Sequence, residues 1–236
     1  MLVLKHLIDF LFPLYCLSCE KKGSLLCERC AKNLPRKTEL RCPHCQSAIT
    51  PNGILCHACC GKNPLDGVFS ASPFRDPLIA KCIHTYKYSF AESLARPLGI
   101  FIADELRRTS IPLPDMMLFV PLHTWRLQWR GFNQAQRLAH IIGDTLAPEL
   151  DLIPKANPLI RCHFTLPQSR QKNKKMRKEN LKNAFRILES TPKDFFRNKR
   201  VWLVDDVATT GYTLVSCATL LKKHGAREVY GITLAS

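Results

Sequence analysis

Acidic residues are scarce in this sequence, and one common phosphate-binding motif is missing. The 236 residues include 19 Asp and Glu against 35 Lys and Arg, which gives a formal net charge of +16. Such an excess of positive charge favours a polyanionic partner: nucleic acid, a membrane surface or a phosphorylated substrate. No Gly-Lys-Ser/Thr follows a glycine-rich run, so the sequence does not fit a P-loop nucleotide-binding protein.

A long apolar run and a cleavable leader are also missing. The apolar stretch at residues 1–15 is interrupted by Lys5, His6 and Asp9, and it is too short to cross a membrane. No signal peptide with a small-residue cleavage site is present. We therefore expect a cytoplasmic protein with no membrane span, whose first residues form a short helix.

Cysteine, by contrast, is abundant: nine of the twelve lie between residues 16 and 60. Eight of these form four C-x2-C pairs: Cys16 and Cys19, Cys27 and Cys30, Cys42 and Cys45, Cys56 and Cys59. In a reduced compartment such pairs are typical of structural zinc sites, in which four thiolates close a tetrahedron. We favour sequential pairing of neighbouring knuckles, because each loop then closes locally. A cross-braced arrangement, or a redox role, is the alternative.

Residues 61–68 contain Gly61, Pro64 and Gly67 and mark a linker. We expect an N-terminal helix and double zinc-ribbon module at 1–62, followed by a larger domain at 66–236. There, apolar runs alternate with helical periodicity, which predicts an α/β fold with a parallel sheet flanked by helices. The predicted strands span 68–71, 116–120, 159–162, 184–188, 201–204 and 228–234, and the predicted helices span 78–88, 90–108, 135–146 and a segment ending at Gly225.

The run from Val201 to Thr213 is the most informative stretch. Four apolar residues indicate a strand buried on both faces, and two carboxylates and a Thr-Thr-Gly-x-Thr loop follow before a helix. The N–H groups of a helix N-terminus favour a phosphate, and carboxylates accept hydrogen bonds from ribose hydroxyls or hold Mg²⁺ through water. We predict a site for a phosphorylated ribose from Asp205, Asp206, Ala208, Thr209, Thr210, Gly211 and Thr213. In the alternative, Thr213 only caps the helix.

A second informative stretch covers residues 123–134. Trp125 and Trp129 lie four residues apart, as do Arg126 and Arg130, so on a helical turn aromatic rings and guanidinium groups form adjacent rows. Such rows suit base stacking and phosphate contact. In the alternative, both tryptophans belong to the hydrophobic core.

Between Arg161 and Arg200 there are thirteen Lys and Arg and three acidic residues, with most of the basic residues at 170–182. This segment lacks a continuous apolar face, which indicates a cationic loop or half-formed helix. It would close over pyrophosphate or follow a nucleic-acid backbone, and a solvated helix face is the alternative. The predicted nucleic-acid surface comprises Trp125, Arg126, Trp129, Lys172, Lys174, Lys175 and Lys178.

The run at 201–213 resembles the 5-phosphoribosyl-1-pyrophosphate (PRPP) signature of type I phosphoribosyltransferases. The cysteine pairs, the Arg-Gly-Phe-Asn-Gln run at 130–134, the cationic loop and this signature, in this order, resemble the ComF competence-protein family, also called GntX-like. The resemblance implies a phosphoribosyltransferase-like domain that binds PRPP with Mg²⁺. It also implies a pyrophosphate region and flexible loop that include Arg130, Asn133, Gln134, Gln168, Arg177 and Asn180.

The family resemblance also implies a function: a cytoplasmic factor of natural transformation that handles incoming single-stranded DNA. Its partners would be single-stranded DNA, PRPP or another phosphorylated ribose, and a helicase or other competence protein. Catalysis is left open, because no catalytic residue is identified. The alternative function is a Mg²⁺-dependent phosphoribosyltransferase with an unknown acceptor.

Overall fold

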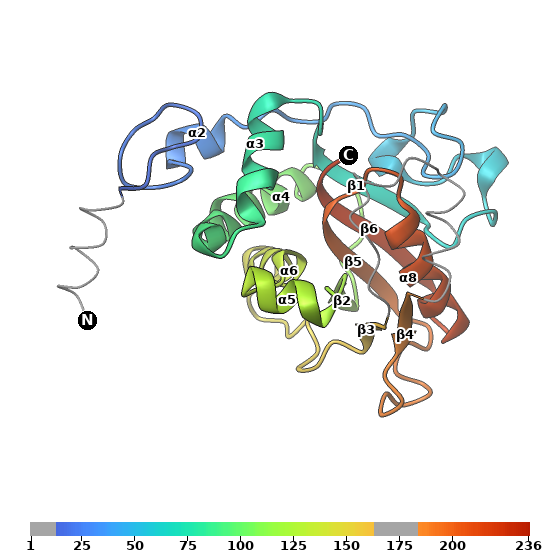
Figure 1. The fold of residues 1–236 in the computed structure, drawn as a ribbon. Coiled ribbons are helices and arrows are strands. Elements are labelled where there is room, and N and C mark those ends of the chain that lie inside the picture. Colours follow the sequence, from blue (N-terminus) through green and yellow to red (C-terminus); the bar gives the residue numbers. More distant parts are fainter. Residues whose placement is uncertain (1–12, 163–183) are drawn as a thin grey trace.

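A parallel sheet forms the centre of the molecule. The computed structural model describes residues 13–162 and 184–236. Its main sheet has four parallel strands in the order β1 (Gly67–Ser72), β6 (Glu228–Ala235), β5 (Arg200–Val207) and β2 (Met116–Phe119) (Figure 1). Parallel neighbours need crossover connections, and helices supply them here. The predicted α/β fold with a parallel sheet is confirmed.

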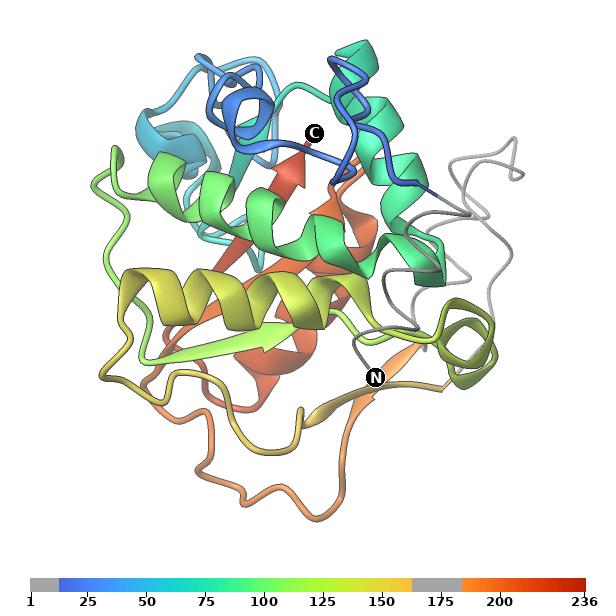
Figure 2. The same ribbon diagram turned by 90° about the vertical axis from the view of Figure 1, so that its left-hand side faces the viewer.

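Helices cover both faces of this sheet. On one face lie α4 (Ala95–Leu106) and α6 (Gln134–Leu146), with α3 (Pro77–Tyr86) beside them, and on the other lies α8 (Tyr212–Lys223) (Figures 1 and 2). A 3₁₀ segment, η3 (Ser89–Leu94), joins α3 to α4. No helix within residues 13–162 and 184–236 is long and apolar enough to cross a membrane.

The apolar run of β5 is buried on both faces, as its composition predicts. Trp202 and Val204 belong to the core under α3, α4 and α6, whereas Val201 and Leu203 belong to the core under α8. Successive side chains of a strand point to opposite faces, so one strand supplies both layers. This arrangement fixes where β5 ends and therefore where its carboxylates emerge.

Two short strands lie outside the parallel sheet. β3 (Leu159–Arg161) pairs with β4 (Phe185–Ile187) in an antiparallel two-stranded sheet. The strands expected at 159–162 and 184–188 are therefore present, but they do not extend the main sheet. A further helix, α5 (Thr124–Arg130), follows β2 and carries the row of tryptophans and arginines.

The two cysteine loops pack against different parts of this α/β body. Around α2 (Glu28–Lys32), the first loop contributes Cys16 and Leu34 to the core that contains α3 and α4. The second loop, with η1 (Pro51–Gly53) and η2 (His57–Cys59), lies at the β1 edge, where Leu55 N–H donates to Asp66 O at 3.0 Å. The division into domains at 1–62 and 66–236 stays a prediction.

Candidate ligand-binding site and metal centres

The loop between β5 and α8 carries the predicted phosphoribose residues. β5 ends at Val207 and α8 begins at Tyr212, directly after Gly211, whose φ is 69°. Glycine adopts this left-handed conformation without steric cost. Gly211 is the residue at the cap position and Thr213 lies inside the helix, so the alternative role of Thr213 as the helix cap is wrong. The N–H groups of the first turn have no intrahelical acceptors.

Five of the seven predicted phosphoribose residues line one depression. With Val207 and Leu214, the lining consists of Asp205, Ala208, Thr209, Gly211 and Thr213. The depression holds about 180 Å³ of space, its solvent-open side included. In the same loop, Thr210 Oγ1 is buried and has no hydrogen-bond partner among the described residues. A buried hydroxyl without a partner is costly, so the loop retains hydrogen-bonding capacity for a ligand.

The two carboxylates interact with each other at the end of β5. Asp206 N–H donates to Asp205 Oδ1 at 2.9 Å. Burial raises the pKa of Asp205 well above its ordinary range, and the Asp206 carboxylate raises it further. Lys87 Nζ lies 3.8 Å from Asp206 Oδ2 and opposes this rise. Neighbouring desolvated carboxylates disfavour each other's charge, which a hydroxyl donor or cation would relieve.

Two partly buried arginines, Arg130 and Arg161, lie near these carboxylates, and Arg126 lies near both arginines. Burial lowers the pKa of Arg130 and of Arg161, and the Asp205 carboxylate counteracts this in both. Burial, with the charges of Arg161 and Arg130, lowers the pKa of Arg126 to about 10. Arg130 Nε is buried without a hydrogen-bond partner among the described residues. Crowded guanidinium groups of this kind favour an anionic ligand that supplies acceptor oxygens.

Sequence reasoning did not assign Lys87 or Arg161 to the site. Lys87 follows α3 and is brought to β5 only by the packing of helices on the sheet. Arg161 ends β3, and its guanidinium carbon lies 5.3 Å from the centre of the Phe185 ring. The Tyr-Lys-Tyr run at residues 86–88 could have indicated Lys87, because it places a cation between two aromatic residues at the end of a predicted helix.

The side chains of Asn133 and Gln134 form hydrogen bonds within the protein, next to Arg130. The Asn133 side chain accepts from Ala135 N–H at 3.0 Å and donates to Val120 O at 3.1 Å. Gln134 Nε2 donates to Tyr86 O at 3.2 Å, while Gln134 Oε1 accepts from Arg130 Nη1 at 3.0 Å. Both residues are buried. They therefore join the ends of β2, α3 and α6 and orient Arg130.

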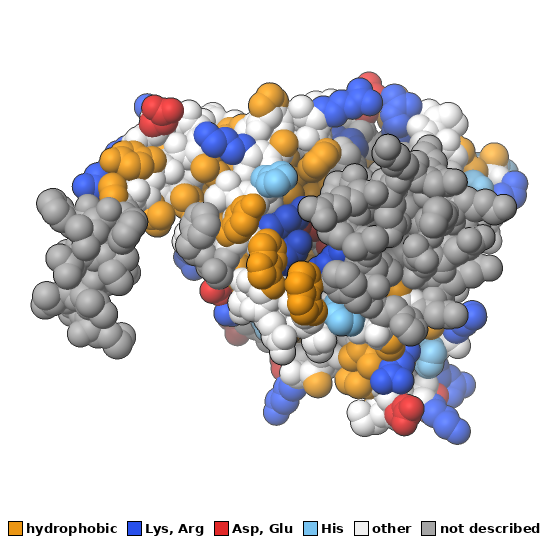
Figure 3. All heavy atoms as spheres, viewed as in Figure 1, with side chains coloured by type: hydrophobic (Ala, Val, Ile, Leu, Met, Phe, Trp, Pro, Cys, Tyr) orange, Lys and Arg blue, Asp and Glu red, His pale blue; other side chains and the backbone are white. Residues whose placement is uncertain are grey.

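Both tryptophans of α5 are on the surface. Trp125 is 57% exposed and Trp129 is 61% exposed, so the alternative that places them in the core is wrong. Tyr88 is also exposed, and its ring centre lies 6.1 Å from that of Trp129 at an interplanar angle of 59°. Figure 3 shows Lys and Arg side chains in a hollow of this face, bordered by hydrophobic side chains.

The rest of the predicted surface is outside the described residues. Gln168, Arg177 and Asn180 of the predicted flexible loop lie within residues 163–183, as do Lys172, Lys174, Lys175 and Lys178. The roles of these positions remain predictions from the sequence, as does the helix expected at the N-terminus, most of which falls within residues 1–12.

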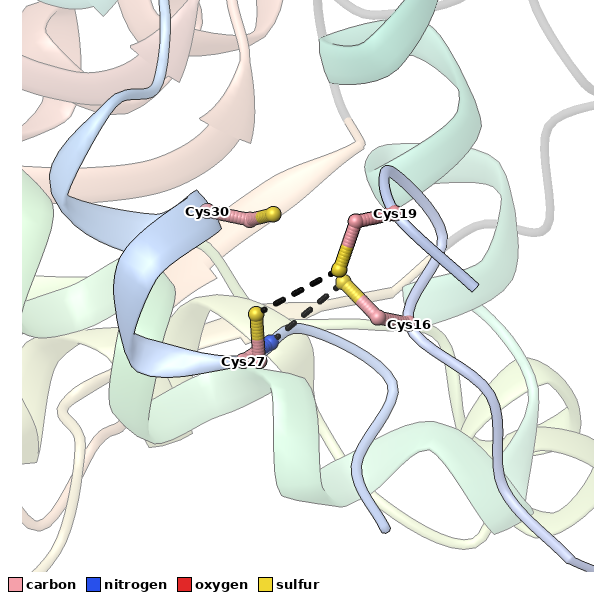
Figure 4. A group of neighbouring side chains, drawn as sticks. All are labelled: Cys16, Cys19, Cys27 and Cys30. Carbon is pink, nitrogen blue, oxygen red and sulfur yellow. Dashed lines mark hydrogen bonds between the residues drawn. The ribbon is translucent and has the colours of Figure 1, made fainter. Parts of the chain in front are cut away.

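The eight paired cysteines form two clusters, and neighbouring knuckles share a cluster. One contains Cys16, Cys19, Cys27 and Cys30, and the other contains Cys42, Cys45, Cys56 and Cys59. In each, the sulfur atoms lie within 4.8 Å of one another. Figure 4 shows the first cluster, in which side chains from two separate segments converge. Sequential pairing is confirmed, and the cross-braced alternative is wrong.

The spacing of the sulfurs fits zinc. Four thiolates about 2.3 Å from a tetrahedral Zn²⁺ lie about 3.8 Å apart. Cys19 Sγ lies 3.7 Å from Cys27 Sγ, and Cys45 Sγ lies 4.0 Å from Cys56 Sγ. His44 and His57 are exposed and belong to neither cluster. With four protein ligands no coordination position would be left open, so a zinc ion held by either cluster would be structural.

The thiols of the second cluster differ in acidity. The Ser47 hydroxyl, with backbone N–H groups nearby, lowers the pKa of Cys45 to about 5. Burial, with the other three cysteines, raises the pKa of Cys59 to about 12. Zinc ligands must be deprotonated. Metal binding to this cluster therefore releases protons, and the proton of Cys59 is held more tightly than that of Cys45.

Comparison with known proteins gives relatives that span most of the chain. Competence protein F of Haemophilus influenzae is 34% identical over 230 residues, which cover 92% of this chain and 95% of that protein. DNA utilization protein YhgH of Salmonella typhi is 31% identical over 86% of this chain and 87% of its own. Competence protein ComFC of Streptococcus pneumoniae is 26% identical over 89% and 87%. No protein-family model matches the sequence.

One solved structure also aligns with part of the chain. The allosteric regulatory enzyme of purine biosynthesis matches 59% of this chain and 25% of its own, at 21% identity and a TM-score of 0.35. The sheet order and the helices on its two faces, rather than this alignment, define the fold described above.

Proposed function

Because the chain belongs to the family of competence protein F and DNA utilization protein YhgH, we propose that it is a cytoplasmic competence factor that handles incoming single-stranded DNA. The relatives' names connect the family with competence and DNA utilization. The basic sequence suits a nucleic-acid partner. A helicase or another competence protein would receive or deliver the strand.

The observation that carries this proposal is the combination of exposed aromatic rings with partly buried arginines on one face. Trp125, Trp129 and Tyr88 present their rings to solvent, and Arg126 and Arg130 lie on the same helix as the tryptophans. Proteins that bind single strands without sequence preference stack bases on such rings and contact the backbone with cations. Core packing does not require three exposed aromatic side chains here.

In the proposed complex, the bases of the strand stack on Trp125, Trp129 and Tyr88. Arg126, Arg130 and Arg161 neutralise phosphates, because their partly buried guanidinium groups are close enough to repel one another. The depression at 205–214 takes a phosphorylated sugar through backbone N–H and Thr hydroxyl groups. The two cysteine clusters would hold zinc, which would keep the cysteine loops folded.

Fluorescence anisotropy with a labelled single strand tests this proposal. We expect binding that weakens steeply with salt and depends little on sequence. Replacing Trp125 and Trp129 together by Ala should weaken binding, whereas Leu113→Ala should not. Leu113 is similarly exposed, but it precedes β2, whereas the tryptophans follow the other end of that strand. Binding that is absent, or unchanged in the double variant, would refute this function.

The alternative function is a Mg²⁺-dependent phosphoribosyltransferase. The acidic pair beside a phosphate-sized depression favours it. Asp205 and Asp206 would accept the ribose hydroxyls and hold Mg²⁺ through water, and Mg²⁺ would neutralise the departing pyrophosphate. Calorimetric titration with PRPP and Mg²⁺, on the zinc-loaded protein and its Asp205→Asn/Asp206→Asn variant, tests this. No heat from either protein would eliminate the alternative.

A further inference from the structure

Two pairs of consecutive residues connect the aromatic surface to the acidic pair. In Lys87-Tyr88, the lysine Nζ lies 3.8 Å from Asp206 Oδ2 while the tyrosine ring is exposed. In Trp129-Arg130, the arginine interacts with both aspartates while the tryptophan ring is exposed. The two rings contact each other. The exposed aromatic rings and the carboxylates are therefore parts of one site, in which Lys87 and Arg130 connect the two.

The donors and acceptors of this site restrict which part of a DNA strand can enter it. The loop at 208–213 offers N–H and hydroxyl groups that suit a phosphate, and Asp205 and Asp206 offer oxygens that suit a hydroxyl. An internal deoxynucleotide has no free hydroxyl, because both sugar oxygens are esterified. Its 3′-phosphate would also lie against two carboxylates, where like charges repel. Only the nucleotide at the 3′ end combines a 5′-phosphate with a free hydroxyl.

We propose that the carboxyl end of β5 is a receptor for the 3′-hydroxyl end of single-stranded DNA, an inference that rests on the DNA-binding function proposed above. The terminal 5′-phosphate lies in the loop at 208–213, and the 3′-hydroxyl donates to Asp205 or Asp206. The terminal base stacks on Tyr88 and Trp129, whose rings stand at the edge of the site. The preceding nucleotides follow α5.

The chemistry of the strand end provides a test on the unmodified protein. Four strands of one sequence are compared by anisotropy: with a 3′-hydroxyl, with a 3′-phosphate, with a dideoxy end, and closed into a circle. We expect the 3′-hydroxyl strand to bind about tenfold more tightly than the other three, the ratio for one hydrogen bond to a charged acceptor. Equal affinities for all four would overturn this inference and leave the DNA-binding function intact. Absence of all binding would refute that function instead.

Free deoxynucleotide is the other source of the same chemistry. A deoxynucleoside 5′-monophosphate should displace the 3′-hydroxyl strand only at much higher concentration, because it lacks the contacts along α5. If it competes as well as the strand itself, the site recognises a free nucleotide and the strand-end proposal is wrong.

A pair of matched variants tests whether the aspartates cause the preference for the 3′-hydroxyl strand. The Asp205→Asn/Asp206→Asn variant should bind the 3′-hydroxyl and 3′-phosphate strands equally, because the two amides remove the charges that attract one strand end and repel the other. Asp194→Asn should keep the tenfold preference, since Asp194 is exposed and precedes the amino end of β5, whereas Asp205 and Asp206 lie near its carboxyl end. A preference that survives in Asp205→Asn/Asp206→Asn would contradict the proposal.

Discussion

The first cysteine loop and the carboxyl end of β5 differ in burial and in how many of their buried polar atoms have a partner within the protein. In the loop, Cys16 is 1% exposed and lies in the core shared with α3 and α4. At the end of β5, buried polar atoms of Thr210 and Arg130 have no partner among the described residues, and Trp129 is 61% exposed. A metal ion would use all four thiolates of the first region. In the second region, a ligand would supply hydrogen-bond partners for Thr210 and Arg130.

This difference suggests that the first cysteine loop contributes mainly to the stability of the fold and the carboxyl end of β5 mainly to ligand binding. A closed metal site and a shared core stabilise the fold, whereas unsatisfied polar groups and crowded charges reduce stability in exchange for affinity. The second cysteine loop is intermediate. Cys42 and Cys59 are buried, but neither belongs to the two hydrophobic cores, and Cys45 is exposed. Substitutions in the three regions should therefore change different quantities.

Removal of zinc should have the largest effect. Structural zinc contributes roughly 10 kcal/mol or more of apparent binding free energy, which is lost on chelation. We expect two zinc ions per chain to be released and the near-ultraviolet circular dichroism to collapse, because the first loop shares a core with α3 and α4. A chelated, metal-free protein that kept its full dichroism would contradict the structural role of the clusters.

Single cysteine substitutions should rank the two loops. Cys27→Ser is expected to lower the free energy of unfolding by roughly 4 kcal/mol, as losses of a metal site in a core do. Cys45→Ser should cost about 1 kcal/mol, because its loop can open locally while both hydrophobic cores remain packed. Denaturant unfolding of both variants measures the ranking. Equal losses would show that the second loop is as integral as the first.

At the binding site, Trp129→Ala should change affinity without changing stability. Stacking of a base on an aromatic ring contributes roughly 1–3 kcal/mol, so affinity for single-stranded DNA should fall about tenfold. Because Trp129 is exposed, the free energy of unfolding should stay within about 0.5 kcal/mol of the parent. Anisotropy and thermal unfolding of the same sample test both halves, with Leu113→Ala as the control.

The smallest effect expected is an increase in the free energy of unfolding on replacement of Asp205. Burial holds the pKa of Asp205 above that of an unfolded chain, so the ionised carboxylate opposes folding once the pH exceeds the unfolded value of about 4. Asp205→Asn should therefore stabilise the protein at neutral pH by about 1 kcal/mol. The gain should shrink as the pH falls toward 4, where the native carboxyl is protonated and neutral like the amide. Thermal unfolding across this range measures it, and a loss at neutral pH would contradict it.

The sequence predicted those parts of the molecule that depend on neighbouring residues. The zinc pairs, the strand at β5 and the loop at 208–213 follow from local spacing and apolar runs. By contrast, Lys87 follows α3 and Arg161 ends β3, and only tertiary packing brings them near Asp206 and Asp205, so no local pattern assigns them. The pairing of β3 with β4 was not predicted either, because strands of three residues carry little information about their partner.

The position of β6 between β1 and β5 sets an order of events during synthesis. β1 pairs with β6, which pairs with β5, so the sheet cannot close before residues 228–235 have left the ribosome. The four cysteine pairs emerge much earlier and can take up metal while translation continues. Joining strands so distant in sequence is slow. A nascent chain can therefore bind metal at its cysteine pairs long before the carboxyl end of β5 is in place between its neighbouring strands.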